Sequence, residues 1–306
     1  MTKPGHNLLT SGILLVCWLV CCSNLLAWQN ETVLKGIEVK PTDIPGYTAV
    51  KISNKTITVD GKLSESQWSN AARTSSFVDL ISGKPAIHKT ESAILWDDDY
   101  LYIAFWVQEP DVQAKYKKQD SPIYYDNDVE IFIGADNAYY EFEMNSFGTI
   151  YEAMVMWNDR YAELGFEKEP TLTRDHKSAQ AFNGVGYKTH PRGPRTIALG
   201  YDFPKLKSAV AVDGSVNNSK DRDRGWTAEI ALPWKGMKHL LLGDARACPP
   251  KENDIWRINL FRFNQYKEAP PAKESSGWAW GRHSVWDSHV PECFPKVTFV
   301  EKKKTK

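Results

Sequence analysis

The sequence lacks a surplus of charge of either sign. Its 306 residues include 38 Lys and Arg against 38 Asp and Glu, so the formal net charge is zero. A nucleic-acid-binding protein needs a surplus of Lys and Arg to neutralise phosphate groups. The balance therefore argues against a nucleic-acid partner. The content of 42% hydrophobic and 25% charged residues is typical of a folded globular domain and excludes a disordered chain.

Cysteine is scarce as well. Three of the five cysteines lie in the first 27 residues, and the other two are Cys248 and Cys293. No CxxC pair or Cys/His spacing typical of a zinc site is present. Two thiols in an exported protein are expected to pair, so we predict a disulfide between Cys248 and Cys293. The alternative is two unpaired buried cysteines, because sequence does not fix the separation of their Cα atoms.

Long hydrophobic runs are absent except at residues 13–27. That run is too short for a transmembrane helix and is typical of a secretory signal. We predict a signal peptide over residues 1–27 and a secreted, periplasmic or cell-surface protein that is not transmembrane. A lipid anchor at Cys22 is disfavoured because Cys21, and not a small residue, precedes it. An uncleaved anchor is the third alternative.

Aromatic residues, in contrast, are abundant. The chain has 12 Trp, 13 Tyr and 12 Phe, so Trp is as frequent as Phe. Because the indole N–H needs a partner when Trp is buried, this number predicts that some Trp side chains are half-exposed and contact a ligand. Trp278, Trp280 and Trp286 lie within nine residues. We expect one or two of them to line a site; the alternative is that all three cap the core.

Many short stretches alternate between apolar and polar residues and are separated by Gly, Asp and Asn. This pattern predicts an all-β fold, a two-sheet antiparallel β-sandwich of jelly-roll type. Short helices are expected only at 65–71 and 233–240. The predicted strands are 56–59, 90–96, 100–107, 128–133, 139–145, 149–157, 209–212, 226–231, 254–263 and 296–300.

The predicted domain organisation follows from composition. Residues 28–52 are polar with Pro and Gly and are expected to form a leader over the surface. The sandwich domain is predicted at 53–302. Within it, residues 158–200 show little periodicity and are expected to form a long insertion at one rim. A basic tail follows at 303–306.

The alternation also predicts which side chains share a face, because successive residues of a strand point to opposite sides. If three of the predicted strands are neighbours, one face combines carboxylates, an amide and aromatic rings. Rings pack on the apolar face of a sugar while carboxylates and amides bind its hydroxyls. The alternative is a solvated outer face. The residues of this face are Tyr102, Trp106, Glu130, Phe132, Glu141, Glu143 and Asn145.

The segment ITVDGKLSESQW at 57–68 has the pattern hydrophobic-x-x-D-G-x-hydrophobic-x-E-x-x-W. Further motifs follow it, in order, at 93–102, 126–133, 140–145, 225–234, 256–259 and 291–294. Together these motifs, which span most of the chain, resemble those of family 9 carbohydrate-binding modules and related DOMON-like β-sandwiches.

This resemblance implies an exported β-sandwich that holds a saccharide chain end between two aromatic rings, with calcium ions serving structure. By position, Tyr124 takes the place of one ring and Glu130 that of a hydroxyl-binding acid. Asn145 agrees with the family pattern, whereas Glu143 stands where the pattern has Arg. The second ring is either Trp280 or Trp286.

We therefore expect an exported carbohydrate-binding protein that acts in polysaccharide recognition or catabolism. Its partners would be an oligosaccharide or polysaccharide and glycan-degrading enzymes. No cofactor is expected apart from structural calcium, for which Asp126 and Asp128 are candidates. The candidate sugar-binding residues are Tyr124, Glu130, Glu143, Asn145, Trp157, Arg262, Trp280 and Trp286.

Two alternatives stay open. Glu130 and Glu143 have the residue types that two-carboxylate glycoside hydrolysis needs, so the chain could be a glycan-active hydrolase. Similar sandwiches also bind haem. The candidate haem ligands are Met144, Met154, Met156 and His289.

Overall fold

The computed structural model describes residues 34–265 and 274–301. The strands of this part form one hydrogen-bonded network that contains two halves. The strands are β1 (Gly46–Lys51), β2 (Val78–Asp79), β3 (Thr90–Trp96), β4 (Tyr100–Gln108), β5 (Asp128–Gly134), β6 (Ala138–Asn145), β7 (Ile150–Trp157), β8 (Ala179–Phe182), β9 (Arg195–Leu199), β10 (Lys207–Asp213), β11 (Gly225–Pro233), β12 (Ile255–Phe263), β13 (Gly277–Ala279) and β14 (Lys296–Val300). The helices are α1 (Ser66–Asn70) and the 3₁₀ turns η1 (Pro41–Asp43), η2 (Ile123–Tyr125), η3 (Phe166–Lys168), η4 (Trp234–Lys238) and η5 (Pro291–Cys293).

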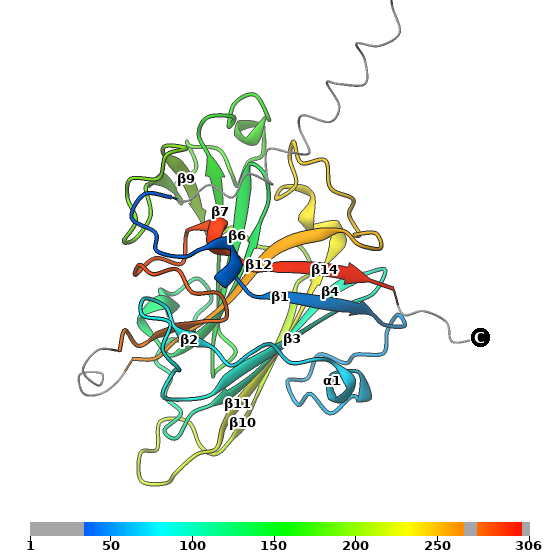
Figure 1. Cartoon of the computed structure of the whole chain (residues 1–306), viewed down its shortest axis with the longest axis vertical. Coiled ribbons are helices and arrows are strands. Elements are labelled where there is room, and N and C mark those ends of the chain that lie inside the picture. Colours follow the sequence, from blue (N-terminus) through cyan, green and yellow to red (C-terminus); the bar gives the residue numbers. More distant parts are fainter. Residues whose placement is uncertain (1–33, 266–273, 302–306) are drawn as a thin grey trace, which may run out of the picture. The chain divides into compact units, whose positions relative to one another are not determined.

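The strand order is β10-β11-β4-β3-β1-β14-β12-β5-β6-β7-β9-β8, and β13 and β2 extend it beside β12. Most pairs are antiparallel, but β1 runs parallel to both β3 and β14. Figure 1 shows β1 and β14 side by side between β12 and the β3–β4 half. The predicted all-β sandwich is confirmed, while the expectation of a purely antiparallel sheet is wrong at β1.

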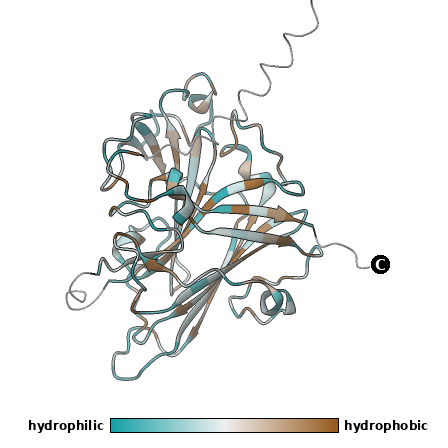
Figure 2. Cartoon of the chain, in the orientation of Figure 1, coloured by the Kyte–Doolittle hydropathy of each residue, from teal (hydrophilic) through white to brown (hydrophobic). Residues whose placement is uncertain are grey.

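The core lies between the two halves. Ile103 and Phe105 of β4 belong to the same buried cluster as Ile131 of β5, Phe142 of β6 and Met154 of β7. Figure 2 shows apolar residues recurring between polar ones along the strands. Because one face of β5, β6 and β7 is used for this core, the side chains of alternate residues point to the opposite face, where the candidate site lies.

Several predicted boundaries need correction. The leader predicted at 28–52 contributes β1 to the centre of the sheet, so the domain begins before residue 53. Residues 56–59 form no strand. The insertion predicted at 158–200 contains β8 and β9, which extend the sheet beyond β7. The sequence did not reveal these strands because each is short and shows little alternation, and because their burial depends on partners far along the chain.

Three other predictions concern the termini and the cysteines. The signal peptide at 1–27, the lipid-anchor alternative at Cys22 and the tail at 303–306 lie outside the described residues. Among the residues that are described, no helix has the length and apolar character needed to cross a bilayer. The predicted disulfide is wrong: Cys248 and Cys293 are both free thiols.

Candidate functional site

Four acidic side chains meet on the outer face of β5 and β6. The antiparallel register places Glu130 opposite Glu143 and Phe132 opposite Glu141. Asp128 lies two residues before Glu130 and therefore on the same face. One carboxylate oxygen from each of Asp128, Glu130 and Glu143 lies within 4.8 Å of the others. We call Asp128, Glu130, Glu141 and Glu143 the acidic cluster.

The acidic cluster is buried and incompletely satisfied. Its four side chains are at most 5% exposed. Each has one carboxylate oxygen without a hydrogen-bond partner in the described part of the chain. Within the same residues, no Lys or Arg forms an ion pair with any of the four. Buried polar atoms are rarely left unpaired, so these oxygens call for an explanation.

Burial raises the pKa of these acids. It raises the pKa of Asp128, Glu130 and Glu143 well above their ordinary values, and neighbouring negative charge raises them further. Burial also raises the pKa of Glu141 to about 8 and lowers the pKa of His289 to about 4. His289 Nε2 lies 3.7 Å from Glu141 Oε1, but near neutral pH both groups are uncharged, so this contact is not an ion pair. Protonated carboxyl groups can both donate and accept hydrogen bonds.

Above these acids lies a pocket of about 530 Å³, which we call the acidic pocket. Its rim carries exposed aromatic rings: Tyr124 of η2 is 44% exposed and Trp286 is 39% exposed. Seven large hydrophobic side chains are exposed in residues 34–265 and 274–301, and four of them line this pocket. Such a concentration marks an interaction site, not scattered surface residues. The four are Tyr124, Tyr125, Val185 and Trp286.

The rim is held in place by contacts beneath it. The Asp287 carboxylate accepts hydrogen bonds from the backbone N–H groups of residues 185–187 at 2.8–3.0 Å and from that of His289 at 2.9 Å. These bonds hold the loop of residues 185–187 against the loop that contains Asp287, and the two loops together form one side of the pocket. The ring of Trp286 packs edge-on against Phe263 of β12, with centroids 5.3 Å apart. The exposed Trp286 ring is therefore positioned before any ligand binds, which lowers the entropic cost of binding.

Another part of the rim is also ordered by aromatic contacts. Tyr124 packs against Tyr151 of β7, with ring centroids 5.7 Å apart and nearly perpendicular. Tyr151 lies opposite Glu143 in the sheet. Burial raises the pKa of Tyr151, and the nearby acids raise it further. Its hydroxyl group stays neutral and can act as a donor.

Of the predicted sugar-binding residues, Tyr124, Glu130, Glu143 and Trp286 line the acidic pocket. Arg262 does not: it is 1% exposed and forms an ion pair with Glu109 at 2.5 Å. Because the buried carboxylate of Glu109 needs a cationic partner, Arg262 has a structural role.

Asn145 and Asp126 are also structural. Asn145 Nδ2 donates to Tyr116 O at 2.8 Å and to Asp126 Oδ2 at 3.1 Å. Asp126 Oδ2 also accepts from the N–H groups of Lys115 and Tyr116. The predicted calcium pair Asp126 and Asp128 is therefore divided: Asp126 orders a loop, and Asp128 joins the acidic cluster.

The remaining two predicted tryptophans lie away from the pocket. Trp157 is 2% exposed and packs against His190, with ring centroids 4.5 Å apart. Trp280 is 3% exposed and packs on Tyr47. Trp278 is fully buried as well. Of the three closely spaced tryptophans, only Trp286 contributes to the site.

The structure does not bring the candidate haem ligands together. Met144, Met154 and Met156 are buried in the core between the two halves, whereas His289 lines the acidic pocket on the other face of the sheet. None of these methionines can therefore pair with His289 as the two axial ligands of one haem.

Sequence reasoning missed several lining residues. Tyr151 alternates in phase with the acids across the sheet, so the register of β6 and β7 could have identified it. Nothing in the sequence around Tyr125, which follows Tyr124, indicates that its side chain is exposed. Val185 and Asp287 belong to loops whose positions depend on contacts about a hundred residues apart, and local sequence contains no sign of them.

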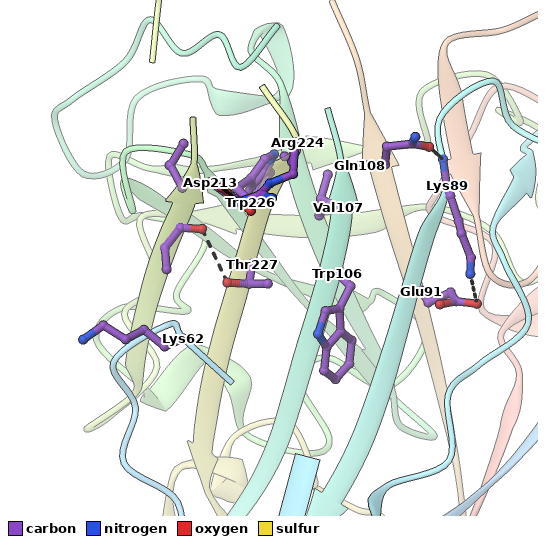
Figure 3. A pocket seen from close by; sticks show the side chains of 13 residues that line it. Lys62, Lys89, Glu91, Trp106, Val107, Gln108, Asp213, Arg224, Trp226 and Thr227 are labelled. Carbon is purple, nitrogen blue, oxygen red and sulfur yellow. Dashed lines mark hydrogen bonds and ion pairs between the residues drawn. The ribbon is translucent and has the colours of Figure 1, made fainter. Parts of the chain in front are cut away.

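A second depression of about 510 Å³ lies on the other half, over β3, β4, β10 and β11 (Figure 3). Its charges are paired: Lys89 with Glu91 at 2.9 Å, and Arg224 with Asp213 at 2.7 Å. The guanidinium of Arg73 lies 3.1 Å from the centroid of the Trp106 ring and covers it. The charged groups of this surface are therefore already paired, and its Trp106 ring is already covered.

The same half explains why part of the predicted sugar face is wrong. Tyr102 and Trp106 lie on β4, which pairs with β3 and β11 and not with β5 or β6. They are therefore separate from Glu130 and Glu143.

Part of the chain matches a known protein family, and its fold is similar to that of solved structures. Residues 80–165 match the model of the family described as carbohydrate-binding family 9. No curated protein is significantly similar to the chain. A structurally similar protein from Bacteroides uniformis, which has been proposed to bind carbohydrate, has a TM-score of 0.52 and 13% identity, covering 83% of this chain and 99% of that chain.

Two structures of a family 9 carbohydrate-binding module from Caldicellulosiruptor kristjanssonii are also similar. The complex with cellotriose has a TM-score of 0.46 and 12% identity, covering 84% of this chain and 95% of that chain. The complex with glucose has a TM-score of 0.46 and 11% identity, covering 85% and 97%. The resemblance to family 9 is confirmed over residues 80–165, together with the sandwich fold.

Proposed function

We propose that this chain, which resembles carbohydrate-binding family 9 over residues 80–165, binds a saccharide in the acidic pocket. One observation carries the proposal: exposed aromatic rings and buried, unsatisfied carboxyl groups line the same pocket on a rigid sheet. A sugar has an apolar ring face and a polar edge, and so needs both kinds of group.

The rings of Tyr124 and Trp286 would pack on the apolar face of the sugar. Glu130, Glu141 and Glu143 would form hydrogen bonds with its hydroxyl groups, since each has an oxygen without a partner. These bonds replace bonds to water, so each contributes only about 0.5–1.5 kcal/mol. We expect affinity of about micromolar order or weaker.

Calorimetric titration of a panel of mono- and oligosaccharides tests the proposal. Binding by the wild type that is lost in Glu130→Gln and in Trp286→Ala supports it. Absence of heat with every saccharide of a broad panel, at concentrations well above millimolar, contradicts it.

Hydrolysis is a second candidate, because carboxylate oxygens of Glu130 and Glu143 lie within 4.8 Å of each other. A hydrolase needs one protonated and one ionised carboxyl group. Here burial raises the pKa of both, and no described donor stabilises either Oε2. This geometry favours binding over catalysis. Release of reducing sugar by the wild type but not by Glu130→Gln would establish the hydrolase instead.

We also propose that the protein is exported and acts in polysaccharide recognition or catabolism beside glycan-degrading enzymes. The apolar run at residues 13–27 supports export. Sequencing the amino terminus of the protein recovered from the producing cells tests this. A mature chain that begins at Trp28 agrees with it, and an intact Met1 in a cytoplasmic fraction contradicts it.

A further inference from the structure

Three buried acids at the acidic pocket form no ion pair with a Lys or Arg of the described chain. Glu130 and Glu143 line the pocket, and Asp128 precedes Glu130 by two residues on the same face of β5. Oxygens of Asp128, Glu130 and Glu143 lie within 4.8 Å of one another. These residues are 0%, 3% and 1% exposed. Asp128 Oδ2, Glu130 Oε2 and Glu143 Oε2 have no hydrogen-bond partner. Burying carboxylates without partners costs several kcal/mol.

A fourth buried acid and the partners of two buried arginines extend this observation. Glu141 lies outside the three-residue group, is 5% exposed, lines the same pocket, and has its own unpartnered Oε2. The buried Arg195 donates to Tyr139 Oη at 2.7 Å and to His289 O at 2.8 Å. Arg262 pairs with Glu109. Neither guanidinium forms an ion pair with the acidic cluster in the part of the chain described.

We propose that Asp128, Glu130 and Glu143 bind a divalent cation of the calcium type, and that this cation coordinates hydroxyl groups of the bound saccharide. Three carboxylates supply between three and six oxygen ligands. Calcium takes about six to eight oxygens at about 2.3–2.6 Å in a flexible arrangement, so positions remain for hydroxyl groups. Magnesium demands a near-octahedral shell and retains water. Coordination of the saccharide rests on the proposed function, whereas the cation site does not.

Metal titration tests the cation site by itself. The full chain is treated with EDTA, dialysed, and titrated with calcium chloride, magnesium chloride or terbium chloride. Tyr151 and Tyr124 line the pocket, so terbium bound there should show luminescence sensitised by tyrosine, and calcium should displace it. We expect Glu143→Gln and Glu130→Gln to weaken calcium binding by at least about 100-fold.

Glu152→Gln is the matched control. Glu152 is also buried, and it lies on β7, but its Oε1 accepts from Tyr140 Oη and from Phe203 N on the core face. Calcium binding should be unchanged in this variant. Circular dichroism establishes that each variant is folded. No calcium binding by the folded wild type, or equal loss in Glu152→Gln and Glu143→Gln, overturns the site.

Saccharide titration with calcium and with EDTA tests the second part of the proposal, which is coordination of the saccharide by the cation. We expect EDTA to weaken saccharide binding about tenfold or more, equivalent to about 1.4 kcal/mol. Equal saccharide affinity in both conditions overturns coordination by the cation and leaves the proposed function standing. Calcium binding with no saccharide binding in either condition supports the cation site and contradicts the proposed function.

Discussion

The most direct prediction concerns the exposed ring of Trp286. A Trp side chain has on the order of 250 Å² of surface, and Trp286 is 39% exposed, which leaves about 100 Å² for a ligand. At about 25 cal/mol per Å², complete coverage by a sugar contributes about 2.5 kcal/mol and half coverage about 1.2 kcal/mol. Trp286→Ala should therefore weaken saccharide binding about 8- to 70-fold.

Isothermal titration calorimetry with the best saccharide of the panel measures this change. Trp286→Phe keeps an aromatic ring and should lose less affinity than Trp286→Ala. The matched control is Trp280→Phe, because Trp280 is 3% exposed and does not line the pocket. That variant should be less stable but bind the saccharide as the wild type does. Unchanged affinity in Trp286→Ala, or a large loss in Trp280→Phe, would refute the assignment of the rim.

Other predictions test the structural roles given above. Arg262→Met leaves Glu109 buried without its cation and should lower the free energy of unfolding by about 3–5 kcal/mol; urea unfolding measures the loss, which adding Glu109→Gln should partly restore. Burial raises the pKa of Glu152 from its ordinary 4.5 to about 7 in the folded state, so ionisation opposes folding and stability falls as pH rises between these values. The free energy of unfolding of Glu152→Gln should equal that of the wild type near pH 4 and exceed it by about 3 kcal/mol above pH 7. Urea unfolding measures both proteins across that range, and a constant difference in their free energies of unfolding would disprove this. Cys248 and Cys293 are free, so mass spectrometry of the unfolded, unreduced protein should find both alkylated, and a bridged peptide would contradict the structure.

The acidic cluster was within reach of sequence reasoning because it depends on local geometry. A short connection joins β5 and β6, with Ala135 N donating to Ala138 O at 2.8 Å. A hairpin this short fixes the register, and the alternation of side chains then places Glu130 beside Glu143. The prediction that these carboxylates share a face needed no information beyond that.

The errors arose where distant segments decide the outcome. Trp106 alternates on its strand as Glu130 does on β5, but the order of strands in the sheet separates them. Arg262 resembles a ligand-binding residue in sequence, and only Glu109, 153 residues away, shows that it is a buried structural cation. Whether a tryptophan in a Gly-rich loop is exposed also depends on packing: Pro295 lies against Gly281, next to the buried Trp280.

The two depressions differ in a way that favours the acidic pocket, and not the other, as the proposed binding site. They are similar in volume, at about 530 and 510 Å³. On the β3–β4 half, Lys89 neutralises Glu91 and Arg73 covers the Trp106 ring, so a ligand would have to break contacts that already exist. On the β5–β6 half, carboxyl oxygens have no partner and aromatic rings remain exposed. Unsatisfied buried carboxylates cost several kcal/mol each, in a domain whose total stability is about 5–15 kcal/mol. Protons relieve that cost in the free protein, and a ligand that supplies hydroxyl groups or a cation relieves it on binding. Relief of this cost therefore contributes to the free energy of ligand binding in the acidic pocket.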